Sequence, residues 1–359
     1  PLRISLVTAL TSPWVLVLLR TVAQFLMSAT VSDVAEKAGV SVATVSRVFN
    51  ESGRVREATR ERVIEAAQAL DYVPNQAARS LKTRETQTIG VVLPDMHGEF
   101  FAEVVRGLDA VAHENGYHLL VSSSHGDAGE VQSVLDTLRG RADALIVLWP
   151  HSDASFLDDI AGSGPPLLLL SAPDGPAGVP RLAVDNLGGA YAATMHLAEH
   201  GHDRIAVFTG PEANAEARDR LAGYRQAIHD AGAVSDPDLV FTGDFSRESG
   251  AALAHDLLAC EPRPSALFAA NDAMAIGALR TLTGQGVDVP DDFAIVGFDD
   301  IPTAGYVSPA LTTVRVPMRT LGREGMQRVL NTLSPASGDA SSQTQTLDTE
   351  LIVRTSCGC

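Results

Sequence analysis

Residues 30–50 read TVSDVAEKAGVSVATVSRVFN, and this stretch predicts two short helices joined by a glycine turn. Thr30 and Asp33 stand at capping-box spacing at the start of the first helix. Gly39 suits the sharp turn, and Ser41 follows it as the N-cap of the second helix. The pattern is typical of a helix-turn-helix, which lays its second helix in a DNA major groove. Taken alone, it is also compatible with an ordinary helical hairpin on a protein surface.

The second predicted helix has an apolar side and an outward side. Val45, Val48 and Phe49 are spaced to pack inward. The outward side chains would meet base edges, where an arginine can donate two hydrogen bonds to guanine and a small apolar group can contact a thymine methyl. These outward residues are Val42, Ala43, Ser46 and Arg47. A third amphipathic helix is predicted over residues 57–70, which favours a complete DNA-binding head.

The segment DYVPNQAARSLKT at residues 71–83 comes directly after the third helix, and here the chain resembles the lactose-repressor (LacI/GalR) family. The resemblance extends from Thr30 nearly to the last residue. It rests on the order and spacing of DVAEKAGVSVATVSRVFN, YVPNQAARSL, TIGVVLPD, GHDRIAVFTGP, RLAGYRQAI, NDAMAIGALR and VPDDFAIVGFDD. The resemblance implies a helix-turn-helix head, a hinge helix and a two-lobed body like that of a periplasmic binding protein.

The resemblance assigns residues 76–81 to the hinge helix, in which Leu81 would insert into the minor groove of the operator DNA. By its sequence pattern alone, the segment is predicted to be a linker. The Val42-Ala43 pair is similar to that of the galactose-repressor subgroup. The DNA-binding residues implied are Thr30, Ser41, Val42, Ala43, Thr44, Ser46, Arg47, Asn50, Tyr72, Asn75, Ala78, Arg79, Leu81 and Lys82.

Length and charge also favour a small head on a larger body. The chain has 359 residues, 45% of them apolar, and a net charge of -17. Residues 28–84 hold nine Lys and Arg against seven Asp and Glu, whereas residues 85–359 hold 16 against 37. We expect a DNA-binding domain at residues 28–74, a hinge and linker at 75–86, and a ligand-binding and dimerisation domain at 87–359. A mildly basic head should depend on base contacts and dimerisation for operator affinity.

Residues 1–27 contain an apolar run, PWVLVLLRTVAQFLM, which Arg20 and Gln24 interrupt. The run is too short for a confident membrane-spanning helix. A family member would naturally start at Met27, so we expect residues 1–26 to be upstream sequence outside the native protein. A membrane-tethered repressor and an exported sugar-binding protein are the alternatives. The predicted head argues against export, and three cysteines make no disulfide framework, so we expect a cytoplasmic protein with no membrane contact.

From residue 87 onward, short apolar runs alternate with helical patterns, which is typical of parallel sheets covered by helices on both faces. The expected fold is α/β: an all-α head followed by two doubly wound lobes. A flexible loop is expected over residues 334–346, before a last strand at 347–355. Strands are predicted at 88–94, 117–123, 144–149, 166–171, 204–210, 266–270 and 293–298, and helices at 100–115, 128–139, 188–200, 216–231, 246–259 and 272–284.

The resemblance implies a ligand cleft between the lobes, at the carboxyl ends of the strands. An arginine fork and short amide or carboxylate groups there suit sugar hydroxyls, and aromatic rings suit stacking. Helix caps or ion pairs remain an alternative for the polar residues, and core packing for the aromatic ones. The ligand-binding residues implied are Asp95, Phe100, Phe101, Arg220, Phe245, Asn271 and Asp299.

Residues 96–99, Met-His-Gly-Glu, depart from the Asn-Pro that many family members carry, and His97 and Glu99 could alter ligand choice. No ligand group has zinc-like spacing, so we expect no metal. His196, His200 and His202 are assigned to a helix-to-strand turn, and Cys357-Gly358-Cys359 is expected to oxidise readily without a function.

The sequence shows neither a dinucleotide-binding fingerprint nor a Walker motif, so we expect no enzyme, no catalytic residue and no cofactor. The prediction is a homodimeric, ligand-responsive repressor that reads a near-palindromic double-stranded operator and that a sugar releases. A corepressor-dependent regulator responding to a purine or a phosphoprotein is the alternative. An exported sugar-binding protein is a second and weaker one.

Overall fold

The computed structural model describes residues 29–50, 54–73, 85–96, 98–151, 157–158, 162, 164–172, 175–334 and 344–359. It divides into two compact units, Pro1–Arg84 and Glu85–Cys359. The predicted leader and hinge helix lie outside the described residues, and with them Asn75, Ala78, Arg79, Leu81, Lys82 and His97. Among the residues described, no helix is long and apolar enough to cross a bilayer.

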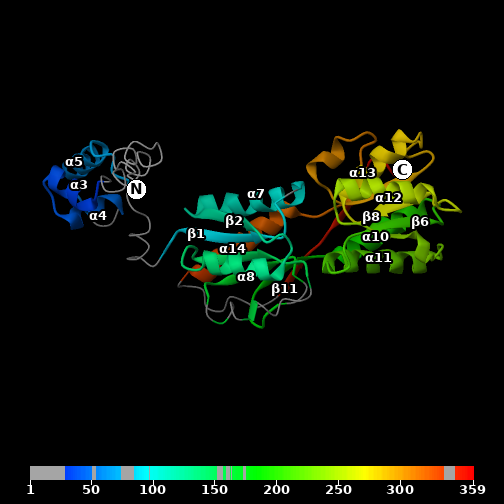
Figure 1. The fold of residues 1–359 in the computed structure, drawn as a ribbon, viewed down its shortest axis with the longest axis horizontal. Coiled ribbons are helices and arrows are strands. Elements are labelled where there is room, and N and C mark those ends of the chain that lie inside the picture. The colour runs from blue at the N-terminus through cyan, green and yellow to red at the C-terminus, as the bar shows by residue number, and fades with distance from the viewer. Residues whose placement is uncertain are drawn as a thin grey trace, which may run out of the picture. The chain divides into compact units, whose positions relative to one another are not determined.

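The first unit contains three helices, α3 (Val31–Ala38), α4 (Val42–Phe49) and α5 (Glu57–Gln68), drawn in blue in Figure 1. The capping box predicted for α3 is confirmed, because Thr30 and Asp33 exchange backbone-to-side-chain hydrogen bonds of 2.7 and 3.3 Å. Gly39 takes the predicted turn with φ of +64°. The third helix is also confirmed, although it ends two residues earlier than expected.

Each helix of the head contributes a fully buried valine, namely Val34, Val45 and Val63. Small alanines on α3 and α5 fill the same core, so the helices approach closely. Because the inward face of α4 is buried in this core, only its opposite face is exposed for binding a partner.

The first lobe of the second unit is built on a six-stranded parallel sheet in the order β11-β5-β4-β3-β1-β2. Its helices are α7 (Glu99–Glu114), α8 (Ala128–Leu138) and α14 (Met318–Leu333), and Figure 1 shows α7 and α8 on opposite faces. The strands are β1 (Thr88–Leu93), β2 (His118–Ser123), β3 (Ala144–Leu148), β4 (Leu167–Leu170), β5 (Arg181–Val184) and β11 (Thr344–Leu347).

Successive side chains of these strands enter two different apolar cores. On β3, Ile146 packs into the core shared with α7, whereas Leu145 and Val147 join Val131 and Leu135 of α8. This two-sided burial explains why the strands read as continuous apolar runs instead of alternating patterns.

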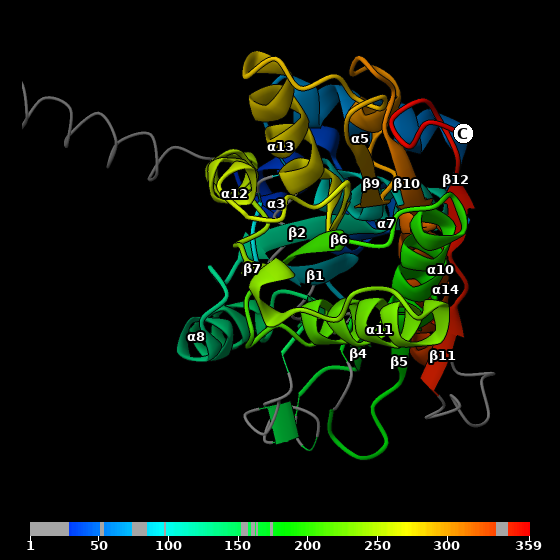
Figure 2. The ribbon, with the colours of Figure 1, turned by 90° about the vertical axis from the view of Figure 1, so that its right-hand side faces the viewer.

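The second lobe has a sheet in the order β12-β10-β9-β8-β6-β7, parallel except for the β10 to β12 pair. Four helices cover it: α10 (Asn186–Glu199), α11 (Ala215–Ala231), α12 (Arg247–Leu258) and α13 (Asp272–Gly284), seen end-on in part in Figure 2. The strands are β6 (Ile205–Thr209), β7 (Val240–Thr242), β8 (Ala266–Ala269), β9 (Ala294–Asp299), β10 (Thr312–Arg315) and β12 (Glu350–Ile352).

The chain passes between the lobes after β5, after β10 and after β11. The predicted fold class is confirmed, but two predictions at the last crossing are wrong. Thr344–Leu347 is not loop, because it pairs with β5 in the first sheet; and residues 347–355 are not one strand, because Glu350–Ile352 pairs with β10 in the second sheet. The last part of the chain contributes one strand to each sheet. Its hydrogen-bonded pairing with the first sheet must therefore end before its pairing with the second sheet begins.

Candidate functional site

The outward face of α4 is the candidate DNA-reading surface. Val42 keeps 44% of its surface exposed, and Ala43 and Arg47 are exposed beside it. Val45 and Val48 are buried on the opposite side, as the sequence predicts. The structure thus presents two small apolar groups and one guanidinium on a helix whose orientation the head core fixes.

The other predicted DNA-binding residues in the described part of the head are largely engaged locally. Ser41 caps α4, accepting a hydrogen bond of 3.2 Å from the Thr44 amide, and Asn50 donates to the Ser46 hydroxyl at 3.0 Å. The Thr30 hydroxyl donates to Asp33. The ring of Tyr72 lies 5.7 Å from that of Phe49, and burial raises the pKa of its hydroxyl. Their first role is to position the helix.

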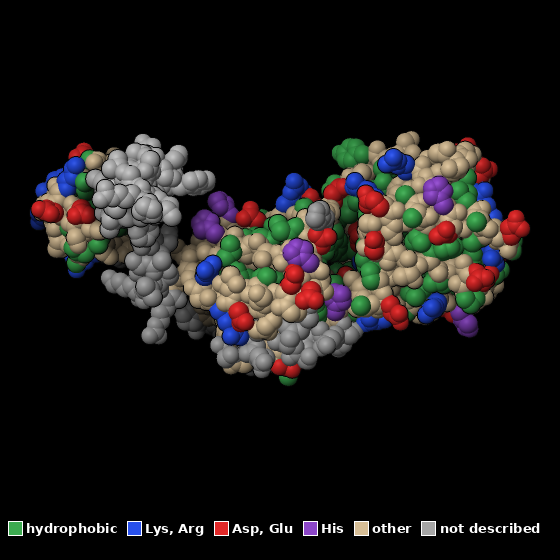
Figure 3. Space-filling model, viewed as in Figure 1, with side chains coloured by type: hydrophobic (Ala, Val, Ile, Leu, Met, Phe, Trp, Pro, Cys, Tyr) green, Lys and Arg blue, Asp and Glu red, His purple; other side chains and the backbone are tan. Residues whose placement is uncertain are grey.

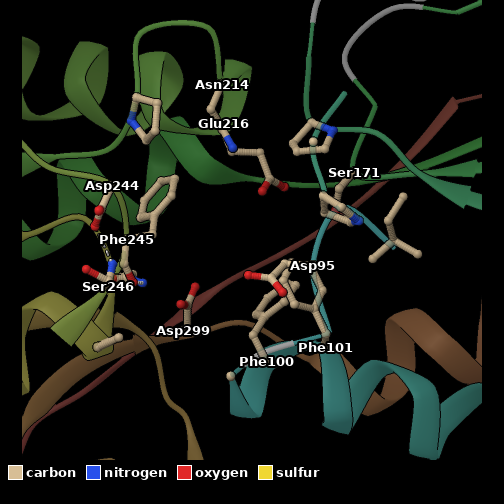
Figure 4. A pocket seen from close by; sticks show the side chains of 18 of the residues that line it. Asp95, Phe100, Phe101, Ser171, Asn214, Glu216, Asp244, Phe245, Ser246 and Asp299 are labelled. Atoms are coloured by element: carbon tan, nitrogen blue, oxygen red, sulfur yellow. Dashed lines mark hydrogen bonds between the residues drawn. The ribbon is translucent and has the colours of Figure 1, made fainter. Parts of the chain in front are cut away.

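A cavity of about 1050 Å³ opens between the lobes, at the carboxyl ends of the strands. Figure 3 shows the hollow with acidic side chains at its rim, and Figure 4 shows its interior. The structure brings all seven predicted ligand-binding residues to this cavity, namely Asp95, Phe100, Phe101, Arg220, Phe245, Asn271 and Asp299. Its volume lies at the upper end of the roughly 300–1,000 Å³ typical of small-molecule sites.

The wall formed by the first lobe combines aromatic and polar groups. Phe100 and Phe101 lie in the first turn of α7, with their rings edge to face and the ring centres 5.4 Å apart. Ser171 follows β4, and its buried hydroxyl has no hydrogen-bond partner. Sequence reasoning missed Ser171, although a polar residue directly after a buried strand is the signal that identified Asp95.

The wall formed by the second lobe is organised around Arg220, which is only 3% exposed. Its Nε donates to Asn186 at 2.8 Å, and its Nη1 donates to the Ala270 carbonyl at 2.5 Å and to Asp299 at 3.2 Å. The guanidinium also lies 3.9 Å from the centre of the Phe298 ring. The ion-pair alternative considered for Arg220 from sequence therefore holds, and its contact with a ligand stays a prediction.

Asn271 likewise has local partners. Its Oδ1 caps α13 by accepting from the Met274 amide at 2.9 Å, and its Nδ2 donates to the Phe245 carbonyl at 3.0 Å. Phe245 has a positive φ of 69°, and its ring lies where a side chain at Gly210 would be. The capping alternative thus holds for Asn271, which also holds the loop that presents Phe245.

Asp299, the ion-pair partner of Arg220, and the nearby Asp272 are both buried carboxyl groups. Burial raises the pKa of Asp299 to about 7, although the neighbouring Arg220 acts to lower it. Asp272 accepts hydrogen bonds from the Thr313 hydroxyl at 2.5 Å and the Ile301 amide at 2.9 Å, and burial and the nearby Asp299 hold its pKa well above the usual range. Asp299 therefore changes charge close to neutral pH.

This titration predicts a pH dependence of stability. A carboxyl whose pKa is raised by folding stabilises the protein fully below pH 4, and that contribution is lost as the pH rises towards 7. Relative to Asp299→Asn, the wild-type free energy of unfolding should fall by a few kcal/mol between pH 4 and pH 7. Urea unfolding of both chains across this range measures the difference, and parallel pH profiles would contradict the assignment.

Glu99 links the two lobes at the mouth of the cavity. It stands in the first turn of α7 and accepts hydrogen bonds from the Thr303 amide at 2.9 Å, the Thr303 hydroxyl at 2.5 Å and Arg247 at 3.1 Å. Both partners belong to the second lobe. The sequence singled out Glu99 only as a departure from the family pattern. The structure shows that it connects the two lobes, and we call its contacts with Thr303 and Arg247 the Glu99 clasp.

Most of the charged side chains in the cavity lining are acidic, and its two arginines are already paired. Arg220 pairs with Asp299, and Arg247 pairs with Glu99. The acidic lining residues are Asp95, Glu99, Glu216, Asp244, Glu248 and Asp299. Such a surface disfavours phosphates and other anions and favours neutral ligands rich in hydroxyl groups. Glu216, Asp244, Asn214 and Ser246 also line the cavity and were missed from sequence.

Comparison with known proteins agrees with both parts of the molecule. Residues 30–75 match a model of the bacterial regulatory proteins of the lacI family, and residues 194–357 match a periplasmic binding protein-like domain. The HTH-type transcriptional repressor PurR of Aliivibrio salmonicida is 35% identical over 305 residues, covering 84% of this chain and 91% of that protein. The repressor CytR of Escherichia coli K12 is 34% identical over 328 residues, covering 91% of this chain and 96% of that protein.

Solved structures show the same similarity. A complex of the transcriptional regulator CelR with cellobiose has 34% sequence identity and a TM-score of 0.68, covering 91% of this chain and 99% of that one. A lac repressor dimer bound to operator and an anti-inducer has 29% identity and a TM-score of 0.80, covering 92% and 99%.

Proposed function

The chain belongs to the lacI family of bacterial regulatory proteins and is a DNA-binding transcriptional repressor; we propose that a neutral sugar in the cleft between its lobes releases it from DNA. Family members are transcriptional regulators rather than enzymes. We further propose that it acts in the cytoplasm as a homodimer on a near-palindromic operator, with α4 of each head in a major groove.

The observation that carries the ligand proposal is the unpaired hydroxyl of Ser171 in the wall of a cavity whose charged side chains are mostly acidic. A buried polar group without a partner costs about 1–3 kcal/mol, which a ligand hydroxyl would relieve. Across the cavity, the carboxylates of Glu216 and Asp244 offer acceptors for further hydroxyls. The rings of Phe100 and Phe245 offer apolar faces on which a sugar ring can stack.

The volume favours a disaccharide over a single pyranose, because the cavity is at the upper end of the range for small-molecule sites. The CelR structure with cellobiose supports this size class. A purine or nucleoside is the second candidate, supported by the edge-to-face pair of Phe100 and Phe101, against which a base could pack. The carboxylates among the lining residues disfavour phosphorylated effectors and a phosphoprotein.

Release would work through the angle between the lobes. A sugar that binds one lobe arrangement more tightly shifts the population towards it, and the shift is limited by that difference in affinity. Ligand and operator then weaken each other by the same factor. The three crossings between the lobes are the segments that must bend.

The experiment is fluorescence anisotropy of the full chain on labelled DNA from its own upstream region, at fixed salt. Monosaccharides, disaccharides, free purine bases and nucleosides are titrated in parallel. Release by one sugar supports the proposal. Tighter DNA binding with a purine would replace it by the corepressor mechanism, and a phosphosugar as the active compound would refute the argument from lining charge.

Glu99→Ala should weaken the ligand response. The clasp to Thr303 and Arg247 is partly exposed, so its loss should destabilise the closed lobes by about 1 kcal/mol and lower affinity for the active sugar by roughly five-fold. Glu114→Ala, at the exposed far end of α7, is the control. Small-angle scattering should show a larger radius of gyration for Glu99→Ala alone; equal radii and equal affinities would contradict the clasp.

A further inference from the structure

Far from each other in sequence, His196 and the Cys357-Gly358-Cys359 segment meet on the second lobe. The Sγ atoms of both cysteines and a ring nitrogen of His196 all lie within 4.8 Å of one another. The Sγ of Cys359 is 3.2 Å from the Nε2 of His196, although 163 positions separate the two residues. Sequence spacing gave no metal-ligand pattern here because α10 supplies one ligand and the segment after β12 supplies the other two.

The cysteine segment is held in place by buried hydrogen bonds. Ser356, which is fully buried, accepts from the Thr312 amide at 2.8 Å and donates to the Ile295 carbonyl at 2.6 Å. The Ile295 amide in turn donates to the Ser356 carbonyl at 2.8 Å. Cys357 is therefore held against the sheet, and its position beside His196 does not depend on a flexible segment.

The sulfur of Cys357 accepts a hydrogen bond from a neighbouring side chain. The Thr312 hydroxyl lies 3.1 Å from its Sγ and accepts a hydrogen bond from the Arg354 amide at 2.8 Å. The hydrogen of that hydroxyl is thus directed to the sulfur, which holds this proposed ligand atom in position. Gly358 has a positive φ of 80°, the left-handed conformation that glycine adopts at little cost, and it returns the chain so that both sulfurs face His196.

We propose that His196, Cys357 and Cys359 bind a thiophilic d¹⁰ cation, Zn²⁺ being the ion of that class that two thiolates and an imidazole suit best. Tetrahedral zinc bonds of about 2.3 Å to sulfur and about 2.0 Å to nitrogen place neighbouring ligand atoms about 3.5–3.8 Å apart. In the structure one pair of ligand atoms is 3.2 Å apart and all three lie within 4.8 Å of one another, so small side-chain adjustments reach that range. Binding forms two Zn–S bonds and one Zn–N bond, and releases one proton from each thiol; water fills the fourth position.

The site would join two parts of the second lobe. His196 stands in the last turn of α10, and Asn186 at the start of the same helix accepts the hydrogen bond from Arg220 in the ligand cleft. A metal at one end of α10 would restrain the helix that supports the cleft arginine at the other. The metal should therefore raise the thermal midpoint of the holo chain.

The test is a titration of the reduced, metal-free full chain with Co²⁺, followed by displacement with Zn²⁺ against a chromophoric chelator. We expect one equivalent per chain and thiolate-to-cobalt charge-transfer absorption, which only sulfur ligation produces. His196→Ala and Cys359→Ser should each weaken binding by more than about 10-fold, because even outer-shell changes cost roughly 10–100-fold. Both residues lie at the surface end of the cluster, so folding is spared.

Two control variants match the chemistry of these substitutions. Cys260→Ser removes the cysteine at the end of α12, and His229→Ala removes an exposed histidine paired with Asp230. Both should bind Co²⁺ like the wild type. Three results would each overturn the proposal. The first is the absence of charge-transfer absorption, and the second is an affinity of Cys359→Ser for Co²⁺ equal to that of the wild type. The third is oxidation of the two thiols to a disulfide at the same rate with and without one equivalent of Zn²⁺.

Discussion

Arg220→Ala should abolish release of DNA by the sugar while the head still binds operator. The guanidinium is 3% exposed and makes three hydrogen bonds, to Asn186, Ala270 and Asp299. Its removal leaves polar groups of the cleft wall without a partner, and each buried polar group without a partner costs about 1–3 kcal/mol. The head has its own core, so operator affinity without sugar should be unchanged.

The measurement is anisotropy on labelled operator with and without the active sugar, together with urea unfolding of each variant. Arg225→Ala is the matched control, because Arg225 lies on the exposed side of the same helix. Arg220→Lys retains the charge without the planar fork and should also lose most of the response. A folded Arg220→Ala protein that the sugar still releases at the wild-type midpoint would remove Arg220 from the ligand site.

The strands that could be predicted from the sequence are those buried on both faces, such as β3 and β8, because their apolar runs need no knowledge of partners. Four strands were not predicted: β5, β7, β10 and β11. They have three or four residues each, and β7 is an edge strand. A run this short has no pattern of its own, and pairing with a neighbouring strand defines it.

The helix α14 was not predicted for a different reason. Its sequence contains Gly322 and Gly325, which weaken the helical pattern. The structure shows that Gly322 is needed for packing, since a Cβ there would lie 2.2 Å from the Val104 carbonyl oxygen of α7. The residue that lowers local helix propensity is the one that allows the two helices to touch.

The location of the cleft residues could be predicted from the sequence, but the residues with which they form hydrogen bonds could not. The family resemblance placed Asp95 and Asp299 in the cleft, each at the carboxyl end of a strand of its own lobe. Pairings such as Glu99 with Thr303, 204 positions apart, depend on how the two lobes close. The same holds for His196 and Cys359, which meet only because β12 returns to the second sheet.

Arg47→Ala should lower affinity for the operator sharply and relax base preference at one position of each half-site. Arg47 is exposed in the last turn of α4, on the face opposite the buried Val45 and Val48. A bidentate arginine to guanine is worth about 1–3 kcal/mol, and a homodimer loses it twice. The expected loss is roughly 10³-fold at fixed salt.

A control with the same change in charge separates base reading from general electrostatics. Arg62→Ala removes an exposed arginine from α5, outside the recognition helix. It should weaken binding to all DNA sequences by a similar small factor, whereas Arg47→Ala should lose affinity for operator and little for unrelated DNA. The slope of affinity against salt reports phosphate contacts. If Arg47→Ala lowers that slope and leaves the base preference intact, Arg47 contacts the DNA phosphate backbone. In that case Val42 and Ala43 are the residues of α4 that recognise the bases.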